Sequence, residues 1–125
     1  MLKVGIVGLG YLGEIHVKCL AELNKDYKII GGFDIDLQRS ENIGALYEIP
    51  IFPSVDSLIE EADIIDIVCT TKAHYSIAKK VIQAGKHVFI EKPITATYEE
   101  AKELVSLCRE NNVRLQVGHV ERFNP

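Results

Sequence analysis

Three glycines at fixed spacing separate an apolar run from an amphipathic segment near the start of the chain. Gly8, Gly10 and Gly13 form a G-x-G-x-x-G pattern. Residues 3–7 before it are typical of a buried strand, and residues 12–23 after it repeat apolar side chains at helical spacing. A strand, a glycine-rich turn and a helix in this order predict the first half of a β-α-β unit.

The same alternation continues to the end of the chain. We expect strands over residues 3–7, 28–33, 49–52, 64–69, 87–90 and 114–117, and helices over 12–23, 37–47, 54–61, 73–84 and 97–109. Buried strands alternating with helices predict a parallel sheet covered on both faces. Right-handed crossovers then favour an α/β fold of three α/β/α layers, the doubly wound Rossmann sheet of order 3-2-1-4-5-6.

Each position of the glycine pattern has a physical role in binding a diphosphate. Gly8 permits a tight turn, Gly10 lets a phosphate approach the backbone, and Gly13 allows the helix to pack closely on the sheet. The free N–H groups of the first helical turn, including Tyr11 and Leu12, would face the phosphates. The alternative is a strand-to-helix turn that binds no ligand.

An acidic residue follows the second predicted strand. A carboxylate at Asp34 can accept hydrogen bonds from both hydroxyls of an adenosine ribose, with Asp36 as a competitor for the role. Asp34 also favours NAD over NADP, because a 2′-phosphate would lie beside a second negative charge. Arg39 is the nearby residue that could reduce this repulsion.

Composition excludes several classes of protein. Apolar residues make up 47% of the chain and charged residues 26%, which is the balance of a globular domain. The net charge of −4 argues against nucleic-acid binding, and the apolar runs are too short to cross a bilayer. The three cysteines have no metal-binding spacing, so we expect free thiols, no metal and a cytoplasmic location.

Several segments around and after the fourth predicted strand are recognisable: Glu91-Lys92-Pro93 directly after a strand, residues 84–88 before it, His74, and the closing segment 117–125. With them the chain resembles the Gfo/Idh/MocA oxidoreductase family over essentially its whole length, from Gly8 to Pro125, and Glu91-Lys92-Pro93 is the most specific motif. That closing segment is similar to members of the family that act on nucleotide-linked sugars. The family often has Thr-Pro where this chain has Thr70-Thr71, which puts the shape of that loop in doubt.

The resemblance implies hydride transfer between NAD and a sugar-type hydroxyl or ketone. It places Lys92 beside the substrate and the nicotinamide, as the catalytic residue and a cofactor contact. It also places Thr70, Thr71, His74 and Glu91 in the cofactor region. We therefore expect an NAD-binding domain over 1–118, and over 119–125 the start of a connection to a C-terminal substrate domain.

Lys92 can act in two ways. A lysine can remove a proton only if its pKa falls from about 10.4 toward neutrality. Burial and the positive nicotinamide ring favour that fall, whereas a carboxylate at Glu91 opposes it. Lys92 therefore serves either as the base or as a charged group that orients the hydroxyl.

Two other functions fit parts of the pattern. A stand-alone NAD(H)-sensing module would use the same pocket without catalysis, and a methyltransferase-like domain would use its glycine loop for S-adenosylmethionine. A homo-oligomer is compatible with the sequence, and the exact substrate is not determined by it. We interpret His16 and His87 as structural histidines.

Overall fold

The computed structural model describes residues 1–91, 95 and 97–118. The strands are β1 (Leu2–Val7), β2 (Tyr27–Phe33), β3 (Ile64–Ile67), β4 (His87–Glu91) and β5 (Leu115–Gly118). The helices are α1 (Tyr11–Glu22), α2 (Leu37–Tyr47), α3 (Val55–Glu61), α4 (Thr71–Gln83) and α5 (Tyr98–Asn111). Strands and helices alternate along most of this part of the chain, as the sequence predicts.

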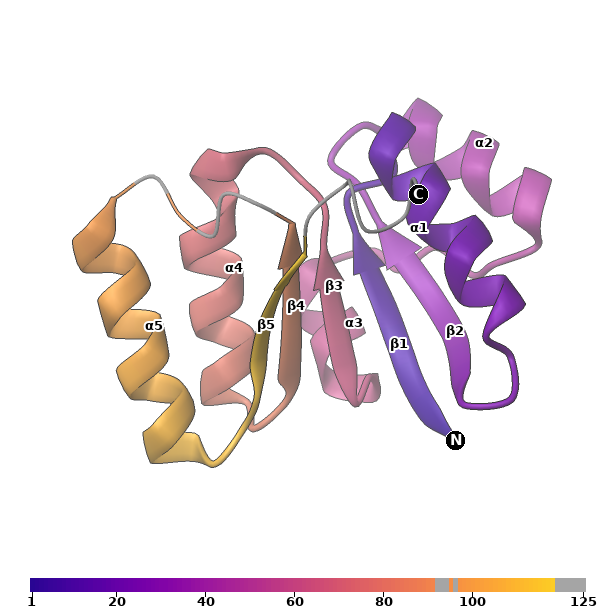
Figure 1. Cartoon of the computed structure of the whole chain (residues 1–125). Coiled ribbons are helices and arrows are strands. Elements are labelled where there is room, and N and C mark those ends of the chain that lie inside the picture. The colour runs from indigo at the N-terminus through magenta and orange to yellow at the C-terminus, as the bar shows by residue number, and fades with distance from the viewer. Residues whose placement is uncertain (92–94, 96, 119–125) are drawn as a thin grey trace.

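The strands form one parallel sheet in the order β2-β1-β3-β4-β5. Their carboxyl ends point to the same edge, at the top of Figure 1. The chain leaves β1 in one direction and β3 in the other, so the order reverses between these two strands. This switch point is where ligands bind in open α/β sheets, and the predicted doubly wound fold is confirmed.

The predicted third strand over 49–52 is wrong in extent. The described chain forms a single parallel bridge there, between Gly32 and Ile51. Two backbone hydrogen bonds hold it, from the Gly32 amide to the Pro50 carbonyl and from the Phe52 amide to the Gly32 carbonyl. Pro50 has no N–H to donate and Pro53 follows closely, so the ladder cannot lengthen. The bridge still occupies the predicted place outside β2.

The predicted fourth strand is also too long. It was expected to run to Cys69, but β3 ends at Ile67 and α4 begins at Thr71. The Val68 amide still donates to the Val7 carbonyl at 2.8 Å, after which the chain turns into α4. The helix therefore begins two residues before the predicted Ala73, and its N-terminus lies at the carboxyl edge of the sheet.

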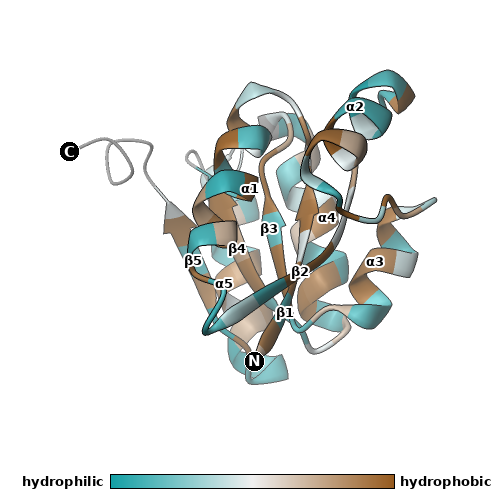
Figure 2. Cartoon of the chain, turned by 90° about the vertical axis from the view of Figure 1, so that its right-hand side faces the viewer, coloured by the Kyte–Doolittle hydropathy of each residue, from teal (hydrophilic) through white to brown (hydrophobic). Residues whose placement is uncertain are grey.

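Helices cover the two faces of the sheet unequally. Helices α1 and α2 pack on the β1–β2 half of one face, and α3, α4 and α5 pack on the other face (Figure 1). The larger core lies under the second group and includes Leu58, Ile65, Ile82 and Leu104. The hydropathy colours show brown, apolar residues along much of the sheet, and helices that carry both teal and brown residues (Figure 2).

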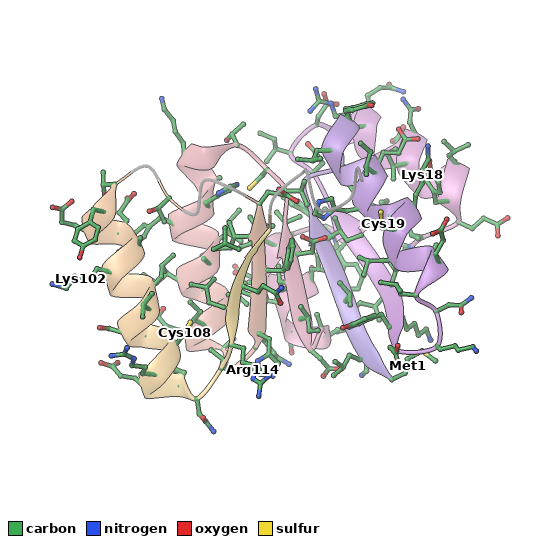
Figure 3. All side chains as sticks on the ribbon, viewed as in Figure 1. Met1, Lys18, Cys19, Lys102, Cys108 and Arg114 are labelled. Carbon is green, nitrogen blue, oxygen red and sulfur yellow. The ribbon has the colours of Figure 1, made fainter. Side chains whose placement is uncertain are left out.

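Helix α5 shows how sequence pattern sets orientation. Thr97 caps its first turn by accepting a hydrogen bond from the Glu100 amide at 3.2 Å. Cys108 points toward the sheet and Lys102 away from it (Figure 3).

Among the helices of the described ranges, not one combines the length and the apolar character that a membrane crossing needs.

Candidate cofactor-binding site

Two positions of the glycine loop after β1 have no space for a side chain. Gly8 adopts φ +105°, a conformation that L side chains rarely adopt, and a Cβ there would lie 2.7 Å from the Cys69 backbone nitrogen. A Cβ at Gly13 would overlap the carbonyl oxygen of Gly8. The first and third glycines are therefore required by the turn and by the close packing of α1, as the sequence predicts.

Gly10 has a different environment. It is the N-cap of α1, and the first helical hydrogen bond runs from the Glu14 amide to the Gly10 carbonyl at 2.9 Å. The nearest atom to a Cβ at Gly10 would be Nη1 of Arg39, at 3.3 Å. The loop is thus bordered at Gly10 by one long, exposed cationic side chain rather than by packed core.

The first turn of α1 presents its amides at this open point. Gly10 has no side chain to cap them, and the amides of Tyr11, Leu12 and Gly13 precede the first residue that can donate within the helix. Tyr11 is largely exposed and Leu12 half-buried. These N–H groups and the positive end of the helix dipole suit an anionic group.

The Asp34 carboxylate lies directly against the glycine loop. Its Oδ2 accepts a hydrogen bond from the Leu9 amide at 2.7 Å, and its Oδ1 accepts one from the Asp36 amide at 2.8 Å. Asp36 instead caps α2 by accepting from the Arg39 amide at 3.2 Å. The structure thus brings Asp34 to the loop and gives its competitor a structural role.

This arrangement fits a dinucleotide. The side-chain-free Gly10, the amides of the first turn of α1 and the neighbouring carboxylate supply donors for a diphosphate and acceptors for ribose hydroxyls. Each carboxylate oxygen of Asp34 keeps a second lone pair after its backbone hydrogen bond. The residues present therefore match the chemistry of NAD.

The loop after β3 borders the same edge. Thr70 is the N-cap of α4 and Thr71 its first helical residue. His74 is buried, with Nε2 2.8 Å from the Cys69 carbonyl oxygen, so it holds the backbone of this loop. Burial raises the pKa of the Cys69 thiol to about 11, with a further contribution from the charge of Asp34. Cys69 is therefore a neutral thiol at physiological pH.

At the end of β4, Glu91 is buried and points to the face that α1 covers. Its Oε1 lies 2.7 Å from Nε2 of His16, whose Nδ1 lies 2.6 Å from Oδ2 of Asp66. We call His16, Asp66 and Glu91 the His16 cluster. The predicted catalytic Lys92 lies outside the described residues, as does the connection expected over 119–125.

Burial and the neighbouring charges change the pKa values of His16 and Asp66. Burial lowers the pKa of His16, but hydrogen bonds and charges from Asp66 and Glu91 outweigh burial, so the pKa is raised. Burial is also the largest influence on Asp66 and raises its pKa; the charge of Glu91 adds to this, and His16 opposes it. Both groups therefore hold protons more tightly than in an unfolded chain.

The sequence prediction missed the ionic role of His16. It placed His16 among structural histidines, and the imidazole is indeed 4% exposed on the inner face of α1. One feature of the sequence could have indicated this role: Asp66 is an acid within an otherwise apolar strand. A buried acid of this kind requires a buried partner. That partner is 50 positions away in the sequence, and Glu91 is 75 positions from His16.

The comparisons agree with this geometry. Residues 2–119 match the family model described as "Oxidoreductase family, NAD-binding Rossmann fold". The chain belongs to the Gfo/Idh/MocA oxidoreductase family. Membership favours a dinucleotide over S-adenosylmethionine as the ligand of the glycine loop, and it confirms the resemblance drawn from the Glu91-Lys92-Pro93 region.

Relatives that are named for different reactions share this domain. The chain is similar to UDP-N-acetylglucosamine 3-dehydrogenase of Acidithiobacillus ferrooxidans, with 36% identity over 99% of this chain and 39% of the relative. A solved structure of that enzyme superposes with a TM-score of 0.90 and 35% identity, over 99% of this chain and 40% of that one. Biliverdin reductase of Synechocystis, solved with biliverdin and NADP⁺, gives a TM-score of 0.91 at 28% identity, over 98% and 39%.

The chain thus spans about two fifths of the length of these relatives. It corresponds to their N-terminal, NAD-binding part. Residues that the relatives carry in their remaining three fifths have no counterpart in this sequence.

Proposed function

We propose that this domain holds NAD(H) for hydride transfer to or from a sugar-type hydroxyl or ketone, most specifically in a nucleotide sugar. The observation that carries the proposal is the contact of the Asp34 carboxylate with the Leu9 amide, which places a ribose acceptor beside the diphosphate donors. NAD supplies the hydride acceptor or donor when bound. The chain's own residues supply binding, orientation and control of protons.

Residues along the carboxyl edge of the sheet have different roles in this proposal. The amides around Gly8, Gly10 and Gly13 bind the diphosphate, and Asp34 binds the adenosine ribose. The backbone at Thr70 and Thr71, held by His74 through the Cys69 carbonyl, borders the cofactor on the β3 side. Beyond Glu91, Lys92 contacts the substrate hydroxyl, either as the base that takes its proton or as a cation that orients it.

The substrate class rests on the relatives. The dehydrogenase of Acidithiobacillus ferrooxidans is named for a nucleotide sugar, and other relatives are named inositol 2-dehydrogenases. The compounds in these names are polyols or sugars with a secondary hydroxyl. On this proposal a C-terminal domain completes the substrate pocket, and the three free thiols support a reducing, cytoplasmic location.

Calorimetric titration with NADH, NAD⁺ and NADPH tests the proposal. We expect saturable binding of NADH and NAD⁺ and weaker binding of NADPH. Folded protein that binds none of the three would overturn the proposal. Equal binding in a Gly10→Ala variant would show that any binding observed uses another site.

A further inference from the structure

The His16 cluster contains one base between two acids, and its geometry restricts where protons can be. Both ring nitrogens of His16 face carboxylate oxygens, at 2.6 and 2.7 Å. A neutral imidazole has one N–H, so it would leave one nitrogen lone pair facing a carboxylate lone pair. Between two ionised acids, the two short contacts are both satisfied when the ring is an imidazolium.

The two acids depend on this cation. Within the described part of the chain, Asp66 Oδ1 and Glu91 Oε2 are buried and accept no hydrogen bond. Their compensation therefore comes through the oxygens that face His16. An acid buried without a counter-charge is strongly disfavoured, so the position of Glu91 is tied to the position of the ring.

The cluster connects the two parts of the proposed site. His16 lies on α1, whose N-terminus presents the diphosphate donors, and Glu91 is the last residue of β4, directly before Lys92. Asp66 on β3 anchors the ring from the strand between β1 and β4. No backbone pairing joins β1 to β4 directly, because β3 separates them.

We propose that His16 is a positioning residue: as an imidazolium held between Asp66 and Glu91, it fixes the end of β4 against α1, the helix that begins at the glycine loop. The importance of this link for the cofactor site rests on the proposed function. The link from α1 to β4 stands on the distances alone.

The surroundings of the ring favour this link. The Phe89 ring meets His16 edge-on, with centroids 6.0 Å apart, and shields it on the β4 side. Gly118 on β5 leaves the space that Phe89 and Glu91 fill. Cys19 on α1 is a further titratable group near the cluster, a thiol whose pKa is raised by burial and by the charges of Glu22 and Asp66. At neutral pH it is uncharged and does not compete for Asp66.

The test compares His16→Gln with Val17→Ala in the whole chain. Gln keeps a polar side chain but cannot balance two carboxylates, whereas Val17→Ala removes buried apolar volume from the same helix without touching the cluster. We expect the Ile90 and Glu91 amides to exchange at least about tenfold faster in His16→Gln than in Val17→Ala, after correction for global stability. Equal exchange in the two variants would overturn the proposal.

A spectroscopic measurement keeps the proposal testable if His16→Gln does not fold. Nitrogen-15 NMR of the wild-type imidazole should show both nitrogens protonated at pH 7, and Glu91→Gln, which keeps an acceptor oxygen but loses the charge, should lower the titration midpoint of the ring. A neutral ring at pH 7, or an unchanged midpoint in Glu91→Gln, would overturn the proposal. These measurements need no cofactor, so a failure of NADH to bind would remove the proposed function and leave the link itself to be judged separately.

Discussion

The Asp34 carboxylate and the Leu9 amide are joined by a 2.7 Å hydrogen bond across two neighbouring strand ends. The bond has two consequences. It fixes the glycine loop from the side of β2, and on the proposed function it holds the carboxylate that accepts the ribose hydroxyls beside that loop. We therefore expect loop conformation and cofactor choice to depend on the same side chain.

Asp34→Asn should change the cofactor preference. An amide removes the repulsion against a 2′-phosphate, so the ratio of NADH to NADPH affinity should fall by about tenfold or more. NADH binding itself should weaken, because the Asn side chain has one acceptor oxygen for the Leu9 and Asp36 amides. Titration with both cofactors measures the change. Asp36→Asn is the matched control, since Asn also caps a helix, and an equal change there would contradict the assignment to Asp34.

Two glycine substitutions should separate folding from binding. Gly13→Ala forces a Cβ into the Gly8 carbonyl, so we expect a loss of about 3 kcal/mol in the free energy of unfolding. Gly10→Ala meets the flexible Arg39 guanidinium instead, so the fold should be retained while NADH affinity drops at least about tenfold. Thermal melts and NADH titrations measure the two effects. Unchanged NADH affinity in Gly10→Ala would contradict the placement of the diphosphate.

The His16 cluster should make stability depend on pH. His16 has an ordinary pKa of 6.5 that folding raises, and folding also raises the pKa of Asp66 from 3.8, so the folded state binds more protons than the unfolded state. The stability that His16 contributes is then complete below pH 6.5 and is lost as the pH rises through its raised folded value. Unfolding free energies of wild type and His16→Gln, measured by urea melts from pH 5.5 to 9, should converge as the pH rises. A constant difference would show that the ring does not titrate with folding.

Gly118→Ala should disturb the end of β4 from the neighbouring strand β5. The added Cβ would overlap the Phe89 ring and lie 3.3 Å from Glu91 Oε1. Because the far end of a Phe ring can shift, we expect a loss of about 1–2 kcal/mol rather than unfolding. Gln116→Ala is the control, since Gln116 is the exposed partner of Phe89 in the same ladder. Equal losses in the two variants, measured by urea melts, would contradict the steric role of Gly118.

The sequence carries the information for the parts of the site that are close together along the chain. The glycine spacing and the acid after the second strand predict the loop and Asp34, because strand ends in a doubly wound sheet meet at one edge. The Gly118–Phe89 contact and the His16 cluster could not be predicted, since they depend on β3, β4 and β5 lying in register. The length of the third strand, over 49–52, was overestimated because its apolar residues favour strands. Pro50 and Pro53 limit its hydrogen bonding.

The single bridge at Ile51 also affects how the protein behaves in a crowded solution. An extended segment of another molecule can lengthen a sheet only where successive N–H and C=O groups are presented to it. Next to β2, the intervening chain contributes Pro50, which has no N–H, and Pro53 two residues after Ile51. Intermolecular strand addition is therefore disfavoured beside Gly32, where the bridging segment covers the outer edge of β2 without forming a full strand.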